Sequence, residues 1–142
     1  MPIPPELRHF YGPEWRNVIR PRILERAGHQ CENCGKPNHA EIRTKTGKGR
    51  MFWRPLKSLT WRNEEGWVLT PEELALAINL PTRVIRVVIV PAHLNHTPGD
   101  DRDENLRAMC QWCHLRHDRG QHRQTFIRHR DDKRTLLLEL AS

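Results

Sequence analysis

The sequence has no long apolar segment, only four cysteines and fewer acidic than basic residues, and each shortage limits the possible functions. Residues 1–15 contain neither the apolar core of a signal peptide nor a run that could cross a bilayer, so we expect an intracellular, cytoplasmic protein. In a reducing compartment, four cysteines are not expected to form two disulfides. Seventeen Asp and Glu against 24 Lys and Arg give a net charge of +7. This balance favours a polyanionic partner such as nucleic acid, although charge alone also fits a merely basic soluble protein.

The length of 142 residues fits one soluble domain with a modest core. Four prolines predict an extended arm at residues 1–13, and apolar periodicity predicts a helix at residues 14–28 that is kinked or divided at Pro21 and capped by Gly28. A capping box after Thr70 predicts a second, short helix. Arg83 to Val90 reads as one buried strand, and the final TLLLELAS as a segment that packs back on the domain. The residues available for the apolar face of the first helix are Trp15, Val18, Ile19, Ile23 and Leu24.

Two cysteine pairs with the same spacing indicate a metal site. A short loop with two residues between its thiols can direct both sulfurs to one tetrahedral ion. One such pair alone could be a redox site, but two pairs together predict one structural Zn²⁺ held by four thiolates. Its ligands would be Cys31, Cys34, Cys110 and Cys113.

A basic segment between the pairs has two possible interpretations. Residues 42–63 contain seven Lys or Arg, no acidic residue, and the aromatic residues Phe52, Trp53 and Trp61. These residues could bind a phosphate backbone and stack on exposed bases. Alternatively, they form a hairpin whose aromatics supply a small satellite core and whose charges are solvated. A second basic segment follows the second pair, from His114 to Arg134. The candidate nucleic-acid-binding residues are Arg43, Lys45, Lys48, Arg50, Arg116, Arg119 and Arg123.

Histidines cluster late in the chain, and histidine can accept a proton near neutral pH or bind a divalent metal. Six of the nine follow residue 92: His93, His96, His114, His117, His122 and His129. Asn105 lies twelve residues after His93, and His114 follows the last cysteine directly. This pattern, AHLNHTPGDDRDENLRAMCQWCH, resembles the HNH (His-Asn-His, ββα-metal) endonucleases, specifically the branch with two Cys-x-x-Cys pairs, many of them small phage-encoded proteins. The resemblance covers residues 28–36 and 84–118 and misses the segment 40–82.

The resemblance implies a role for each matching residue. His93 would be the general base that activates water for attack on a phosphodiester in DNA. Asn105 would hold its loop and the base in register or contribute to the metal environment. His114 would bind one catalytic divalent ion, such as Mg²⁺, Mn²⁺, Ni²⁺ or Zn²⁺, which is distinct from the structural zinc. Such a protein would work in the cytoplasm, for example that of a phage-infected bacterium.

One position departs from the family pattern. Many members have a metal-binding Asp or His before the general base, whereas this chain has Ala92. The nearest substitutes as ligands are His96, His117 and Asp118; the last two lie one helical turn from His114 and can share its face. If nothing replaces the missing ligand, the chain would be a weak or inactive HNH scaffold that binds nucleic acid or a protein partner as a regulator or inhibitor. A redox or structural zinc protein without a nucleic-acid partner is a third, less favoured interpretation.

The predicted fold class is therefore α+β, with a ββα-metal finger and a four-cysteine zinc site in one small domain, preceded by a short helix and carrying a basic aromatic insertion. The predicted segments are the arm at 1–13, the helix at 14–28, the first zinc knuckle at 29–39, the insertion at 40–82, the ββα-metal core at 83–120 and a basic tail at 121–142. The oligomeric state remains open, since one site per chain suits a monomer that nicks or a dimer that cuts both strands.

Overall fold

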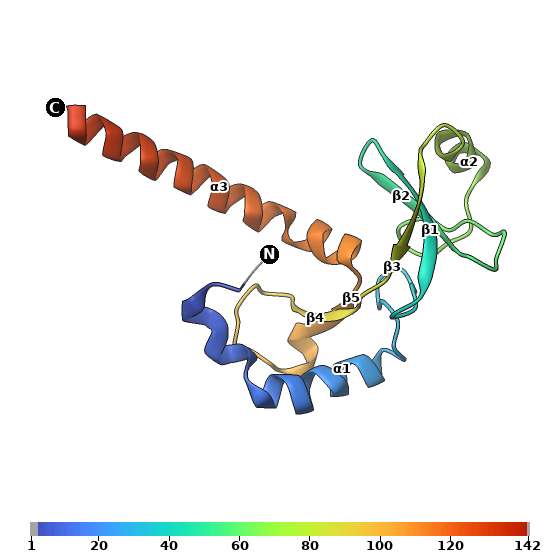
Figure 1. Cartoon of the computed structure of the whole chain (residues 1–142), viewed down its shortest axis with the longest axis horizontal. Coiled ribbons are helices and arrows are strands. Elements are labelled where there is room, and N and C mark those ends of the chain that lie inside the picture. Colours follow the sequence, from blue (N-terminus) through green and yellow to red (C-terminus); the bar gives the residue numbers. More distant parts are fainter. Residues whose placement is uncertain (1–2, 142) are drawn as a thin grey trace.

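The chain forms one small domain of mixed α and β structure, from which its last helix extends (Figure 1). The computed structural model describes residues 3–141, so residues 1–2 of the predicted arm and Ser142 of the predicted tail lie outside it. A three-stranded antiparallel sheet has the order β2-β1-β3, and a two-stranded antiparallel sheet pairs β4 with β5. The elements are η1 (Pro5–Tyr11), η2 (Trp15–Ile19), α1 (Arg20–Arg26), β1 (Glu41–Gly47), β2 (Arg50–Pro55), α2 (Pro71–Ala77), β3 (Thr82–Arg86), β4 (Val90–His93), η3 (Asp103–Asn105), β5 (Leu106–Met109) and α3 (Gln111–Ala141).

The N-terminal segment is more ordered than its prolines suggested. Residues Pro5–Tyr11 form a 3-10 helix, so the prediction of an extended arm is wrong there. Near the predicted division at Pro21 the helix changes type but does not break. A π-helical turn ends at Ile19, where the N–H of Arg20 donates to the carbonyl of Trp15, and α1 continues directly with helical torsion angles at Ile19 and Arg20. Gly28, with a φ of 66°, follows the helix and lets the amide of His29 donate back to the carbonyl of Leu24.

One side of this helical segment packs on the domain core. Trp15, Ile19 and Ile23 are buried as predicted, whereas Val18 is exposed, which corrects its assignment to the apolar face. Val18 lies in the π-helical turn, where successive side chains are spaced by a different angle than in an α-helix. The α-helical periodicity therefore does not predict which of these side chains are buried.

The basic segment folds as a hairpin, and the turn between β1 and β2 is Lys48-Gly49, with positive φ at both residues. Phe52 is fully buried in a satellite core to which Trp61 adds a half-buried ring, while Trp53 lies in the main core. The satellite-core interpretation is therefore confirmed for Phe52 and Trp61, whereas Trp53 belongs to the main core. Because Phe52 and Trp53 are buried, they cannot stack on bases. The capping box of α2 is confirmed at Thr70.

The predicted single strand from Arg83 to Val90 is in fact two strands in different sheets. Residues Thr82–Arg86 lie at the edge of the hairpin sheet, where Val84 is 51% exposed. The chain then crosses over through Val87 and Ile89, both buried, and continues as β4. Gln111 supports the crossing, since its side chain donates to the carbonyl of Arg86 and accepts from the amide of Val88. The apolar run is continuous across the two strands because Val87 and Ile89 lie in the main core and Ile85 packs against it.

The final helix α3 is continuous for 31 residues, and Figure 1 shows it projecting away from both sheets. The predicted boundary at residue 120 is not a structural one, and the expectation that TLLLELAS packs back on the domain is wrong for residues 135–141, which are exposed. The exposed leucines are Leu136, Leu137, Leu138 and Leu140. Among the described residues, no helix is both long and apolar enough to cross a membrane.

Candidate metal centre and histidine site

The two cysteine pairs meet at one buried point. Cys31 and Cys34 lie in the loop after α1, Cys110 follows β5, and Cys113 lies in the first turn of α3. The four thiols are free, and their sulfurs lie within 4.8 Å of one another. The Sγ atoms of Cys34 and Cys110 are 3.7 Å apart, which is the edge of a tetrahedron with metal–sulfur bonds of about 2.3 Å. The four cysteines thus form a cluster that could hold a structural metal ion.

A buried lysine balances the charge of this site. Lys36 is only 1% exposed, and its Nζ lies 3.2 Å from Sγ of Cys34 and 3.8 Å from Sγ of Cys110. It also lies over the ring of Trp53, 5.3 Å from the centroid. Burial opposes the charge on Lys36, but the sulfurs of Cys110 and Cys34 outweigh it and raise the pKa of the ammonium group. Sequence reasoning missed Lys36, because a lysine two residues after a cysteine gives no sign of burial.

His93 lies at the end of β4 with its orientation set by three neighbours. Its Nε2 is 2.8 Å from a carboxylate oxygen of Asp101. Its ring stacks on Trp15, with centroids 5.2 Å apart, and meets the edge of Tyr11 at 6.2 Å. Burial, with the nearby charges of Asp101 and Asp118, raises the pKa of Tyr11, so its phenol stays neutral beside the histidine. No sequence pattern indicates these contacts, because they join η1, η2 and the loop after β4.

Asn105 is buried and holds the loop that carries Asp101. Its Nδ2 donates to the carbonyl of Asp100 at 2.8 Å and to Oδ1 of Asn95 at 2.9 Å. Its Oδ1 accepts from the amide of Asn95 at 3.1 Å. The side chain therefore joins both ends of the loop, which is the positioning geometry expected for this residue.

A second group of possible metal ligands lies between the turn after β4 and α3. His96, His117 and Asp118 place their ligand atoms within 4.8 Å of one another. The two imidazole rings stack with centroids 4.6 Å apart. One oxygen of Asp118 lies 3.0 Å from Nε2 of His96, and the other lies 3.0 Å from Nε2 of His114. Burial lowers the pKa of His114 despite the charge of Asp118, which favours its neutral form, the form that binds metals.

Within this group, His117 is further fixed by a hydrogen bond to the main chain. Its Nε2 lies 3.1 Å from the carbonyl of Leu94, so its Nδ1 is the nitrogen left for a ligand. We name His96, His114, His117 and Asp118 the histidine cluster. The backbone turn from His93 to His96, closed by a hydrogen bond of 3.1 Å, connects this cluster to His93.

The alanine before His93 belongs to the core. Ala92 is 3% exposed and packs among the buried apolar residues of the main cluster. The potential ligands come instead from one turn later in the chain and from α3, two segments whose proximity only the fold establishes.

The predicted nucleic-acid-binding residues fall on two separate surfaces. Arg43 and Lys48 are exposed on the hairpin sheet. Arg50 forms ion pairs with Glu64 and Glu73, and Lys45 donates to the carbonyl of Leu80. The other three, Arg116, Arg119 and Arg123, are exposed on α3.

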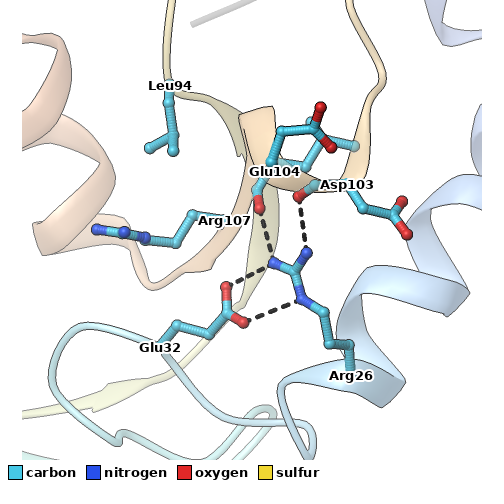
Figure 2. Close-up of a pocket in the computed structure, with 7 residues that line it drawn as sticks. Arg26, Glu32, Leu94, Asp103, Glu104 and Arg107 are labelled. Carbon is cyan, nitrogen blue, oxygen red and sulfur yellow. Dashed lines mark hydrogen bonds and ion pairs between the residues drawn. The ribbon is translucent and has the colours of Figure 1, made fainter.

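An arginine connects the first cysteine loop to the loop of Asn105 (Figure 2). Arg26 donates to both oxygens of Glu32, at 3.2 and 3.0 Å, and to the carbonyls of Asp103 and Leu106, at 2.8 and 2.7 Å. Glu32 in turn accepts from the amide of Ala108 at 2.9 Å. These contacts line an open polar cavity of about 370 Å³ and fix the chain on both sides of Asn105.

Comparison of the chain with models of protein families, with curated proteins and with solved structures finds no match. The chemistry proposed for the two sites is therefore based on the residues and contacts of this chain alone.

Proposed function

We propose that this protein is a metal-dependent endonuclease of the HNH type that hydrolyses phosphodiester bonds in DNA. In this proposal β4, β5 and the start of α3 form a ββα-metal finger, and the four-cysteine site holds a structural Zn²⁺. The observation that carries the proposal is the position of His93, oriented by Asp101 and one backbone turn from the histidine cluster. A base and a set of metal ligands side by side are what hydrolysis of a phosphodiester requires.

His93 is suited to act as the general base. A carboxylate bonded to Nε2 favours the tautomer that carries its proton there, which leaves a lone pair on Nδ1. Nδ1 would take a proton from water as the oxygen attacks phosphorus, and the bond to the leaving oxygen would break. Trp15 holds the plane of the ring, so the direction of the lone pair is fixed before substrate binds.

The histidine cluster would hold the divalent ion. Two imidazoles and one carboxylate within 4.8 Å are a suitable donor set, and the carboxylate also contacts His114. A bound ion would stabilise the negative charge that develops on the phosphate and the leaving oxygen. Asp118 positions His96 and His114 from one side chain, so it is the residue on which this cluster most depends.

Plasmid cleavage tests the proposal. Wild-type protein is incubated with supercoiled plasmid in a series of Mg²⁺, Mn²⁺, Ni²⁺ and Zn²⁺, beside His93→Ala and the matched control His129→Ala, which removes an exposed histidine of α3. We expect His93→Ala to lower the rate by about 10²- to 10⁴-fold, as for loss of a general base, and His129→Ala to leave it unchanged. Asp118→Asn should raise the metal concentration needed for half-maximal cleavage.

Two results would overturn the proposal. One is a plasmid that stays intact with every metal, and the other is cleavage that His93→Ala does not slow. DNA binding that persists without cleavage would instead favour the binding-module interpretation, for which the buried Ala92 at the usual ligand position is the supporting observation.

A further inference from the structure

The charges of α3 are separated onto two sides of the helix. With 3.6 residues per turn, successive side chains are about 100° apart, and five of the six arginines of α3 then fall in a sector about 60° wide. We name these five the arginine stripe: Arg116, Arg119, Arg123, Arg130 and Arg134. Three of the four acidic residues of α3, Asp118, Asp132 and Glu139, lie on the opposite side together with the sixth arginine, Arg128, and Asp131 lies beside the stripe. Such separation is not needed to keep a helix soluble.

The stripe is exposed and almost unpaired. All five arginines are exposed, and within residues 3–141 only Arg130 has a carboxylate within 4 Å, that of Asp131 at 3.4 Å. From Arg116 to Arg134 the rise of 1.5 Å per residue gives a length of about 27 Å. One strand of DNA has a phosphate about every 3.4 Å, so this length matches about eight phosphates.

The stripe lies on the side of α3 opposite the histidine cluster. His114 and Asp118 lie on the face that meets the turn after β4, and Arg123 and Arg134 are about half a turn away from His114. A straight helix cannot present both faces to one point of a duplex. Nucleic acid bound by the stripe is therefore not the segment that lies at His93.

The order of residue types around the helix favours a nucleic acid over a lipid surface. In a helix that lies on a membrane, the apolar side chains occupy the centre of the buried face and the cations its margins. Between Arg116 and Arg134 the arginines occupy the centre, while Phe126 and Ile127 lie at the two margins of the sector. Guanidinium groups in a row bind phosphate oxygens, often with two hydrogen bonds each.

We propose that the arginine stripe binds the phosphate backbone of a second DNA segment, away from the segment that is cut. The identity of the polyanion as DNA rests on the proposed function, whereas the position of the stripe does not. The protein would hold its substrate at two places, with the projecting helix as the second contact.

Binding is measured apart from cleavage, in a His93→Ala background without added divalent ion. The stripe variant Arg119→Gln/Arg123→Gln/Arg130→Gln is compared with the control Lys57→Gln/Arg83→Gln/Arg86→Gln, which removes the same charge from exposed positions outside α3. Each lost phosphate contact lowers the slope of log K against log salt by about 0.9, so we expect the stripe variant to lose about 2.7 in slope and more than tenfold in affinity. The control variant should lose less than a third of that decrease in slope.

A second measurement tests whether one protein molecule binds two DNA segments at the same time. Two duplexes with donor and acceptor dyes should show energy transfer on wild-type protein at monomeric concentration, and the stripe variant should abolish the transfer. Unchanged affinity and slope in the stripe variant, or equal loss in the control, would overturn the proposal, as would stripe-dependent binding to anionic vesicles with DNA binding unaffected. These outcomes are independent of plasmid cleavage, so failure of the nuclease proposal and failure of the stripe proposal are distinguishable.

Discussion

Replacing Asn105 by Asp should open the loop between β4 and β5 while leaving the size of the side chain nearly unchanged. The new carboxylate can still accept from the amide of Asn95, but it cannot donate to the carbonyl of Asp100 or to Oδ1 of Asn95. Asn95 cannot rotate its amide to compensate, because its Oδ1 also accepts from Thr97 and its Nδ2 donates to Asp100. Each donor and acceptor in this network therefore has a fixed role, and the substitution puts an acceptor where residue 105 must donate.

The cost follows from the two lost donors. Each lost hydrogen bond is worth about 1 kcal/mol, and the partly buried carbonyl of Asp100 left without its donor adds about 1 kcal/mol, so we expect a loss of about 3 kcal/mol. Asn105 is 6% exposed, so water has little access to the carboxylate that would replace its amide. Against a typical total stability of about 5–15 kcal/mol, this is enough to open the loop locally before the domain unfolds.

Urea denaturation measures the loss, and hydrogen exchange at Leu94 and Asn95 locates it. Asn17→Asp is the matched control, because Asn17 is exposed and should change stability by less than about 0.5 kcal/mol. The introduced carboxyl would have a folded-state pKa above its unfolded value, so the deficit relative to wild type should shrink as the pH falls through that raised pKa. A deficit below about 1 kcal/mol at neutral pH would refute the view that Asn105 holds this loop.

Two further substitutions test the supports around the sites. Arg26→Lys keeps the charge but cannot reach two carbonyls and both oxygens of Glu32 at once. Because most of these bonds are exposed, we expect a loss of about 1–2 kcal/mol in urea denaturation, and wild-type stability would contradict the clamp in Figure 2. Lys36→Met removes the cation beside the thiolates, so chelator competition should find metal held about 10- to 100-fold more weakly, and unchanged retention would show that the ammonium does not support the site.

The sequence predicted correctly those features that depend only on residues close together in the chain. The capping box at Thr70 and the cap at Gly28 depend on a few neighbouring residues, and both are confirmed. Near Pro21 the helix changes from π- to α-helical geometry but is not divided. The strand from Arg83 to Val90 was predicted wrongly, because an apolar run reads the same whether it serves one sheet or passes between two. The basic aromatic hairpin was open to two interpretations, since composition does not tell which face of a strand is buried.

The sequence by itself determined which residues were able to do chemistry: the two cysteine pairs, the late histidines and Asn105 are visible in their types and spacing. The tertiary structure decided how they are grouped. It paired His93 with Asp101 and stacked its ring on Trp15, brought His96 to α3, and buried Lys36 among the sulfurs. These groupings depend on which distant segments pack together, and packing is a property of the whole core that no single spacing encodes.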